Sequence, residues 1–304
     1  MNVASPRLSE AAVDSASDRI IGFAGLLSVA YLAVMTWPLW MHMRTTGAIA
    51  PLVLHLATLA CGALALGVHR GSPPFRVARD WLPLIAGPVM YVELRWIIAA
   101  LGAVHRDALL MAWEARLFPS NPSLTLAPRM QVLALSELLH LAYASYYALV
   151  YVPPFILYVR RRRAEFAATM LTLTIVYGAC FLAYALFPVD GPRYLVGPAA
   201  APDGPVRRFV LALLEQGSSR GTAFPSSHVA ASVVSALCTL QFQPRLGAVV
   251  TLIAALLTVA TVYGGFHYAV DALVGVMLGL LAWLGAQAAR TVLASLGSQI
   301  ATAD

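Results

Sequence analysis

Long apolar segments alternate along the chain with short polar ones, and most apolar segments contain about 20 residues. An α-helix of that length, with few charges, crosses a hydrocarbon core of about 30 Å. The predicted segments cover residues 20–41, 49–68, 81–104, 136–159, 166–187, 226–243, 246–264 and 268–289. The pattern predicts an all-α, polytopic integral membrane protein with about eight transmembrane helices.

The apolar stretch over residues 226–264 is broken near its middle by Gln-Pro-Arg at 243–245. Proline lacks a backbone N–H and pushes the preceding residue towards extended geometry, so it cannot continue a helix. The break therefore predicts a hairpin of two membrane helices. Because the chain crosses and returns, His228 and His267, which flank the hairpin, are expected at the same membrane face.

The composition agrees with membrane insertion. Hydrophobic residues make up 60% of the 304 residues and charged residues only 11%, whereas soluble domains contain about 25% charged residues. All 20 basic residues are arginine, and the formal net charge is +6. The arginines are scattered between apolar segments, without an aromatic-rich basic surface, so a nucleic-acid partner is not expected.

The arginines instead predict the topology. Residues 160–163 are four consecutive arginines in a very short loop, and such loops stay in the cytoplasm. The loop at 69–80, Arg245 and Arg290 fall on the same side of the membrane in this register. We therefore expect a protein of a bacterial inner (plasma) membrane whose segment 188–223 and two flanking histidines lie outside the cytoplasm.

Several polar side chains interrupt the apolar segments. Glu93 and Arg95 lie in the third segment, and Glu137 and His140 lie early in the fourth. Charges at membrane depth are costly, so these residues are expected to face the bundle interior or an aqueous cavity. They serve either structural pairing or recognition of a lipid head group. His55, in the second segment, is interpreted as a hydrogen-bonded contact between helices.

Four tyrosines form one helical stripe of the fourth segment: Tyr143, Tyr146, Tyr147 and Tyr151. Residues three or four positions apart share one face of a helix. Tyrosine is enriched where helices meet the membrane surface, so we interpret the stripe as packing or an interface belt.

The candidate chemistry lies at the two ends of the predicted hairpin. His267 and Asp271 are four positions apart, so on a helix the carboxylate can reach the imidazole ring. A carboxylate that accepts the Nδ1 proton fixes the tautomer and leaves Nε2 as the basic nitrogen. This arrangement prepares His267 as a nucleophile or a base. His228, from another helix, is placed for the opposite proton transfer.

The segments around these histidines resemble a known family. Phe-Pro-Ser-Ser-His at 224–228 and Tyr-Gly-Gly-Phe-His-Tyr-Ala-Val-Asp at 263–271 are similar to the second and third signature motifs of the type 2 phosphatidic acid phosphatase superfamily. The sequence looks most like the branch of the inositol phosphorylceramide synthases (inositolphosphotransferases) and their bacterial relatives. The resemblance covers roughly residues 80–290, including Gly-Pro-Arg-Tyr at 191–194, and implies a catalytic core of six membrane helices.

The polar segments and the resemblance together suggest four parts of the chain. These are a cytoplasmic tail at 1–19, two additional membrane helices within 20–80, a catalytic membrane domain at 81–290 and a C-terminal tail at 291–304.

The resemblance also assigns roles to the candidate residues. His267 would attack phosphorus and form a phosphohistidine, while Asp271 orients its ring. His228 would protonate the leaving oxygen and later deprotonate the incoming water or alcohol. The family needs no metal or cofactor for this chemistry, and its partner is a membrane lipid.

Three further residues are expected to hold the phosphate. Arg193 matches the phosphate-binding arginine of the first signature motif, and a guanidinium fork fits phosphate oxygens. Ser226 and the backbone N–H groups around Ser227 would bind the phosphoryl oxygens at the start of a helix, where the helix dipole favours an anion.

Two departures from the family pattern concern cations. Hydrolase members begin the third motif with Ser-Arg, where this chain has Ala-Thr at 260–261, and their first motif uses a lysine, which this chain lacks. Fewer cations suit a singly charged phosphodiester, the donor type of the synthase branch. Arg207, Arg208 and Arg220, in the same predicted loop as Arg193, are candidates to compensate.

Alternative functions stay open at this point. The chain could be a lipid phosphatase or a phosphotransferase, since only the accepting hydroxyl differs, or a non-catalytic lipid-binding or transport protein with the same fold. Two histidines and a carboxylate could bind zinc, but a zinc site would not need Arg193 and Ser226. A hydrolase with a serine nucleophile is disfavoured, because no nucleophile-elbow pattern surrounds Ser226 or Ser227. The lipid and the oligomeric state are not readable from the sequence.

Overall fold

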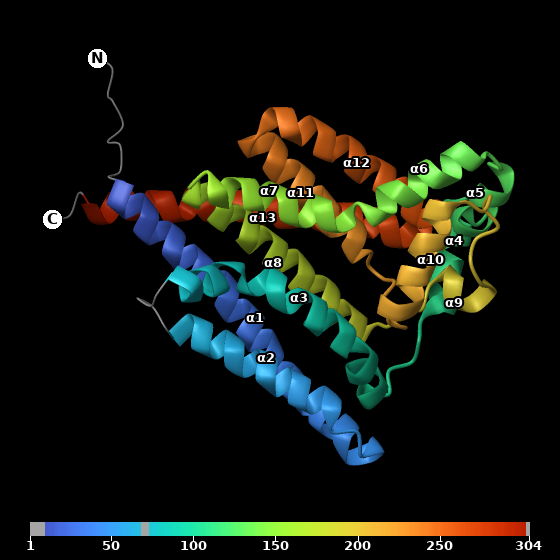
Figure 1. The fold of residues 1–304 in the computed structure, drawn as a ribbon, viewed down its shortest axis with the longest axis horizontal. Helices are drawn as coiled ribbons and strands as arrows, with labels where there is room; N and C mark the ends of the chain where they lie inside the picture. Colours follow the sequence, from blue (N-terminus) through green and yellow to red (C-terminus); the bar gives the residue numbers. More distant parts are fainter. Residues whose placement is uncertain (1–9, 68–72, 302–304) are drawn as a thin grey trace.

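The computed structural model describes residues 10–67 and 73–301, which form a bundle of helices joined by short connections (Figure 1). The helices are α1 (Glu10–Thr46), α2 (Ala50–Gly67), α3 (Pro73–Leu101), α4 (Asp107–Leu117), α5 (Pro122–Arg129), α6 (Leu133–Ala144), α7 (Tyr146–Val159), α8 (Arg163–Leu186), α9 (Pro192–Val196), α10 (Pro205–Gly217), α11 (Ser227–Phe242), α12 (Pro244–Tyr263) and α13 (Ala269–Ala301). Within these ranges, β structure is limited to an isolated bridge between Val189 and Thr222. The all-α prediction is confirmed.

All eight predicted apolar segments are helical, although two differ from a simple span. Six described helices are long and apolar enough to cross a membrane: α1, α2, α3, α8, α12 and α13. The fourth predicted segment is divided at Ser145 into α6 and α7, with a bend of 46°. The sixth, α11, has only 16 residues. The described chain is therefore a polytopic membrane protein with six spanning helices, or seven if the bent pair forms one span.

The two predicted tails are partly helical. α1 already begins at Glu10, and α13 continues to Ala301. The rest of these tails, residues 1–9 and 302–304, and part of the predicted cytoplasmic loop, residues 68–72, lie outside the described residues.

The segment predicted as an extracytoplasmic loop contains two helices, α9 and α10. α10 begins with Pro205, which fits the first helical position because its missing N–H is not needed there. The carboxylate of Glu137 then accepts hydrogen bonds from the backbone amides of Val206 and Arg207, at 2.9 and 3.0 Å. Glu137 thus has a structural partner that no sequence spacing indicated. Figure 1 shows α4, α5, α9 and α10 gathered at one end of the bundle, away from the start of α1 and the end of α13.

An ion-pair network joins α1, α3 and α8 at the opposite end. Asp80, which is almost fully buried, accepts hydrogen bonds from Arg79 and Arg163 at 2.9 Å each. Asp18 pairs with both arginines. The contacts place Asp80 and Arg163, from two of the predicted arginine-rich loops, at the same end of the bundle.

A second polar contact joins α1, α2 and α3 deep in the bundle. His55 of α2 and Glu93 of α3 are both fully buried, and Nδ1 of the histidine lies 2.9 Å from a carboxylate oxygen of the glutamate. Nε2 of His55 lies 2.8 Å from the carbonyl oxygen of Leu32 in α1. The interpretation of His55 as a helix contact is confirmed, and Glu93 has a structural partner.

Two glycines allow α13 to pack closely against α11. A Cβ added to Gly275 would lie 2.7 Å from the carbonyl oxygen of Ser226, and one added to Gly279 would lie 2.7 Å from that of Ala230. Small residues four positions apart let membrane helices approach backbone to backbone. α11 and α12 form the predicted hairpin, which turns at Gln243. This packing brings the start of α11, with His228, beside the start of α13, which follows His267.

Candidate active site

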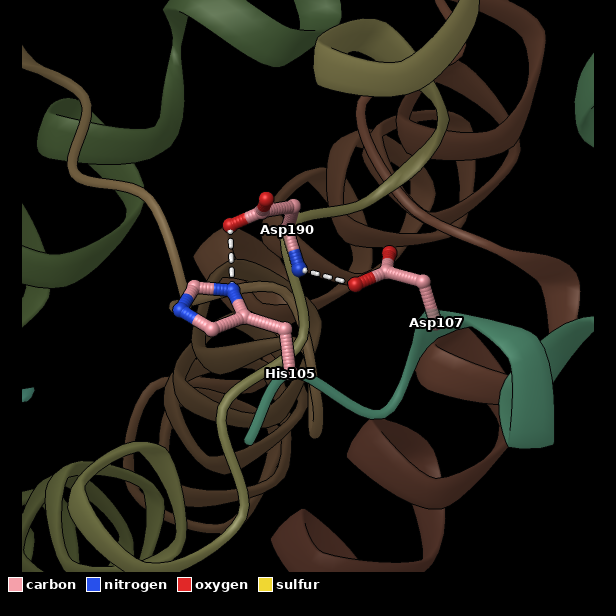
Figure 2. A group of neighbouring side chains, drawn as sticks. All are labelled: His105, Asp107 and Asp190. Atoms are coloured by element: carbon pink, nitrogen blue, oxygen red, sulfur yellow. Dashed lines mark hydrogen bonds and ion pairs between the residues drawn. The ribbon is translucent and has the colours of Figure 1, made fainter. Parts of the chain in front are cut away.

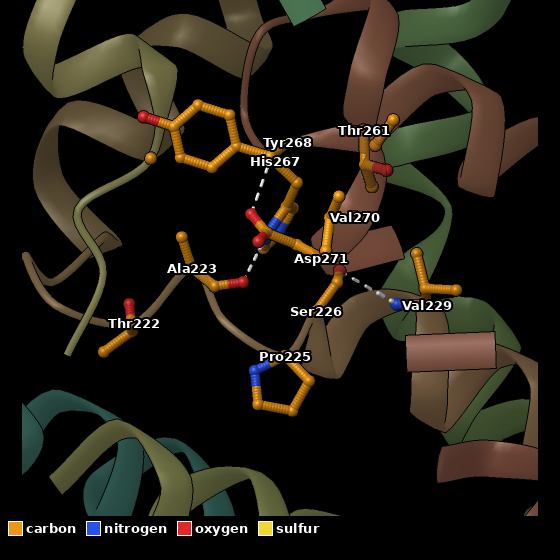
Figure 3. Close-up of polar contacts among 12 residues, drawn as sticks. Thr222, Ala223, Pro225, Ser226, Val229, Thr261, His267, Tyr268, Val270 and Asp271 are labelled. Carbon is orange, nitrogen blue, oxygen red and sulfur yellow. Dashed lines mark hydrogen bonds and ion pairs between the residues drawn. The ribbon is translucent and has the colours of Figure 1, made fainter. Parts of the chain in front are cut away.

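His267 is oriented by a backbone carbonyl as well as by Asp271 (Figure 3). Its Nδ1 lies 2.8 Å from the carbonyl oxygen of Ala223 and 3.6 Å from a carboxylate oxygen of Asp271. A carbonyl oxygen only accepts hydrogen bonds, so Nδ1 carries the proton and Nε2 has the free lone pair. The tautomer is the one we expected. Its shortest hydrogen bond, however, goes to Ala223, and the carboxylate is a second, longer contact.

Asp271 and Glu114 cap the start of α13. Asp271 accepts a hydrogen bond from the backbone amide of Tyr268 at 2.8 Å, as an acid in the first turn often does. The carboxylate of Glu114, from α4, accepts from the amides of Ala269 and Val270 at 3.0 Å each. Burial raises the pKa of the Glu114 carboxyl, while its two amide bonds act in the opposite direction. Glu114 fixes the helix that follows His267, and nothing in its local sequence indicated this role.

His228 faces His267 across a ring-to-ring distance of 6.0 Å. The ring of Tyr143 stacks on it at 5.1 Å, with the tyrosine hydroxyl 3.4 Å from Nε2 of His228. Tyr146 packs against the same ring at 4.3 Å. The two histidines predicted to act together are adjacent. Two tyrosines that we interpreted as packing or a membrane belt enclose one of them, so that interpretation was incomplete.

Ser226 and Ser227 are occupied by structural contacts. Ser226 is the N-cap of α11, and its hydroxyl accepts from the amide of Val229 at 3.4 Å. The amide of Ser227 donates to the hydroxyl of Tyr184 at 3.0 Å. Two of the first three amides of α11, those of Ser227 and Val229, thus have protein partners. Ser227 lines the cavity described below, whereas Ser226 is fully buried beneath it.

The short helix α9 brings Arg193 to the site. The amide of Arg193 donates to the carbonyl oxygen of Gly265, two residues before His267, at 3.0 Å. Gly191, just before α9, has φ +87°, and a Cβ there would lie 3.0 Å from the carbonyl oxygen of Phe266. Only glycine fits such a backbone conformation at so close an approach. The loop therefore holds the predicted phosphate-binding arginine beside the predicted nucleophile.

The other candidate arginines divide into two groups. Arg207 and Arg208 pair with the carboxylate of Asp203, at 2.9 and 3.0 Å. The hydrogen bonds from Arg208 and then Arg207 lower the pKa of Asp203. Arg220 lies 4.0 Å from a carboxylate oxygen of Asp190 and over the ring of Tyr194 at 5.1 Å, and Arg193 lies over the same ring at 4.5 Å. Of the three candidates, Arg220 is therefore the one beside Arg193.

Ala-Thr at 260–261 stands where hydrolase members of the family have Ser-Arg. Here Thr261 stabilises the turn before His267. The carbonyl oxygen of Thr261 accepts from the amides of Phe266 and His267 at 3.0 and 3.1 Å. The Thr261 hydroxyl donates to the carbonyl oxygen of Thr258 at 2.8 Å. Thr261 thus fixes the backbone of the site without adding a charge.

A group of acidic and histidine side chains lies next to the site (Figure 2). The ligand-type atoms of His105, Asp107 and Asp190 lie within 4.8 Å of one another, close enough to hold a metal ion. They already bind protein groups: Asp107 accepts from the amides of Asp190 and Gly191, and Asp190 accepts from the amide of Gly221 and lies 2.8 Å from Nδ1 of His105. The group ties the α3–α4 connection to the loops that carry Arg193 and the first histidine motif.

A cavity of about 220 Å³ opens beside the two histidines. His228, His267 and Arg193 line it together with aromatic residues from α3, α7 and α8. The cavity thus joins the candidate nucleophile, the candidate acid and the candidate phosphate-binding cation in one space.

One of the comparisons with known proteins identifies a family. No curated protein and no solved structure matches the chain. A family model described as the PAP2 superfamily matches residues 108–285, which is more than half of the 304 residues. Membership suggests a function of the lipid phosphatase type, since members are generally phosphatases or phosphotransferases. The chain therefore belongs to the PAP2 superfamily.

Proposed function

We propose that this protein removes or transfers the phosphoryl-type group of a membrane lipid through a covalent intermediate on His267, at the extracytoplasmic face of a bacterial inner membrane. The observation that carries the proposal is the tautomer of His267. Its Nδ1 donates to Ala223, so Nε2 is the unprotonated nitrogen of a residue that lines the cavity, and His228 lies opposite.

In the first step, Nε2 of His267 attacks phosphorus, the N–P bond forms and the P–O bond to the leaving group breaks. His228 gives its proton to the leaving oxygen. The positive charge that develops on the His267 ring is stabilised by the Ala223 carbonyl and by Asp271, 3.6 Å away. Arg193, with Arg220 nearby, supplies positive charge for the phosphoryl oxygens.

In the second step, water or an alcohol attacks the phosphohistidine, and His228 takes the proton of the incoming hydroxyl. The N–P bond breaks and His267 returns to its starting tautomer. Water releases phosphate or a phosphate monoester, whereas an alcohol yields a new phosphodiester or phosphomonoester. With Arg207 and Arg208 paired to Asp203, the positive charge near the site suits a singly charged phosphodiester, as in the inositol phosphorylceramide synthase branch.

The test uses purified protein with excess chelator and a panel of lipid phosphomonoesters, diphosphates and phosphodiesters, with and without an alcohol such as inositol. Phosphate release that is lost in His267→Ala supports a phosphatase, and a new phospholipid formed only with the alcohol supports a transferase. Radioactive phosphate that stays bound to wild-type protein denatured in detergent at alkaline pH, where the N–P bond of phosphohistidine is stable, but not to His267→Ala, supports the covalent intermediate. Turnover that survives His267→Ala contradicts the mechanism, and silence on every lipid favours a lipid-binding or transport protein.

A further inference from the structure

The cavity extends from the two histidines along α3, α7 and α8 towards the middle of the bundle. On α3 its lining includes Leu84, Gly87, Pro88 and Tyr91, a stripe with helical spacing. Tyr91 marks the end near the site, because its hydroxyl lies 3.0 Å from that of Thr222, next to Ala223. From Val92 to Leu84 the helix rises by about 12 Å. The cavity therefore reaches well beyond the space that a phosphate needs.

The tyrosine stripe, which runs from the end of α6 into α7, marks the same path. Tyr143 and Tyr146 contact His228, whereas Tyr151, two turns further along, donates a hydrogen bond from its hydroxyl to the carbonyl oxygen of Leu84 at 2.8 Å. The lining residues of α3 and those of α7 thus indicate independently that the cavity runs from the two histidines to the Leu84–Tyr151 contact.

The walls of this extension present carbon surfaces, even though many are tyrosines. Four of these tyrosines have hydroxyls bonded to protein, in the pairs Tyr91–Thr222, Tyr146–Tyr177 and Tyr151–Leu84. With their polar atoms bonded to protein, these side chains offer mainly ring faces to the cavity. Such a space suits a hydrocarbon chain better than a row of water molecules, which need polar partners.

The far end of the extension is closed. Beyond the Leu84–Tyr151 hydrogen bond, Trp81 lies one turn earlier on α3 and packs against Phe155, Tyr158 and Phe166 at ring distances of 6.4, 5.8 and 5.4 Å. The side of the extension, in contrast, meets the surroundings of the bundle. Tyr147 exposes 55% of its surface, and Pro88 is also exposed. A lipid could enter from the membrane at this side and meet an end wall.

We propose that the extension, named here the tail channel and lined by Leu84, Gly87, Tyr91, Tyr147, Tyr151 and Tyr177, binds one hydrocarbon chain of the substrate lipid and limits its length at the Leu84–Tyr151 contact. The proposal rests on the proposed function for the position of the phosphate at His267. It assigns a role to α3, which lies outside the residues matched by the family model.

Gly87 provides a direct test. It lines the tail channel, and a Cβ added there would meet nothing within 4 Å. Gly87→Phe therefore fills the channel without a clash at its first atom, and it replaces glycine with a better helix former. Gly285 of α13 is the matched control, because it is also helical, meets nothing within 4 Å and lies outside the cavity lining.

The experiment measures binding of single-chain alkyl phosphonates, from hexyl to hexadecyl, to protein in lipid nanodiscs. Phosphonates keep the anionic head but resist hydrolysis. We expect affinity for the wild type and Gly285→Phe to rise with chain length and then level off. Gly87→Phe should lower the affinity for the hexadecyl probe about tenfold or more and leave the hexyl probe within about twofold. Equal behaviour of the two glycine variants, or affinity independent of chain length, would overturn the tail channel.

A second variant examines the end wall. Leu84→Ala lengthens the channel, so the chain length at which affinity levels off should increase, and an unchanged value would refute the limit on length. The readout also separates this inference from the proposed function. Chain-dependent binding without turnover of any lipid would contradict the catalytic proposal alone, whereas turnover with chain-independent binding would contradict the tail channel alone.

Discussion

Two buried histidine–carboxylate pairs lie in the described part of the chain, one in the N-terminal helices and one at the candidate active site. His55 and Glu93 are 2.9 Å apart, closer than His267 and Asp271 at 3.6 Å. Both histidines also contact a backbone carbonyl, that of Leu32 or of Ala223, at 2.8 Å. By residue type, burial and distance, the N-terminal pair would be the stronger candidate for an activated histidine.

The difference lies in the second ring nitrogen. In His55 the carboxylate contacts Nδ1 and the carbonyl contacts Nε2, so both nitrogens are bound to protein. In His267 the carboxylate and the carbonyl both approach Nδ1, which leaves Nε2 for a substrate in the cavity. A histidine–carboxylate pair is therefore a candidate catalytic unit only when its partners converge on one nitrogen.

The largest expected loss of turnover comes from removing the unprotonated Nε2 of His267. His267→Ala should reduce turnover by about 10³-fold or more, because it removes the nitrogen that we propose forms the covalent bond. The thermal midpoint should stay close to that of the wild type, since the start of α13 keeps its caps from Asp271 and Glu114. Activity assays and thermal unfolding of the same preparation check both expectations.

Breaking the N-terminal pair should instead affect stability. His55→Leu leaves Glu93 buried without its partner, and we expect the free energy of unfolding to fall by about 3–5 kcal/mol. The double variant His55→Leu/Glu93→Leu should regain most of that loss, because it removes the unpaired charge. Turnover per folded molecule should be unchanged in both, as measured by activity normalised to folded protein. A selective loss of turnover would contradict the structural role of this pair.

Asp271→Asn distinguishes the two contacts of the Asp271 carboxylate, one with the Tyr268 amide and one with the His267 ring. The asparagine oxygen can still accept from the Tyr268 amide, but the negative charge near His267 is lost. We expect turnover to fall by about 10- to 100-fold, with unfolding hardly changed. Unchanged turnover in a steady-state assay would mean that Asp271 acts as a helix cap alone.

The smallest expected effect concerns Tyr143. Tyr143→Phe keeps the ring that stacks on His228 but removes a hydroxyl whose contact with Nε2 is long, at 3.4 Å. The net contribution of such a hydrogen bond corresponds to a change in turnover of about two- to tenfold. A much larger loss, measured across pH, would indicate that the hydroxyl takes part in moving the proton.

Relations within one helix, or across one tight turn, were determined by the sequence alone. The four-residue spacing predicted the contact of Asp271 with His267, although His267 lies two residues before the start of α13, so a turn and not helix periodicity makes the contact. The apolar segments predict the helices, and the break at 243–245 predicts the hairpin. These features depend on helix periodicity and on the chemistry of proline, which act over a few residues. The hairpin pattern pointed to His228 and the resemblance to a family motif pointed to Arg193, and the structure brings both residues to one cavity.

Tertiary structure decided the partners that come from other helices. Ala223 is the closest partner of His267, Glu114 caps α13 from α4, and Tyr184 takes the amide of Ser227. None of these contacts has a fixed spacing along the chain, because each depends on how closely helices cross and on how the loops fold back. Gly275 sets one such crossing, since a side chain there would separate α13 from α11.

The tyrosine stripe illustrates the same limit. Its spacing predicted that Tyr143, Tyr146, Tyr147 and Tyr151 face the same way, and all four line the cavity although the segment bends between α6 and α7. The spacing, however, is identical for a lipid-facing belt, a packed seam and a cavity wall. Only the position of α7 between His228 and α3 turns that face towards the candidate active site. Sequence periodicity fixes which residues share a face, and the packing of neighbouring helices fixes what that face meets.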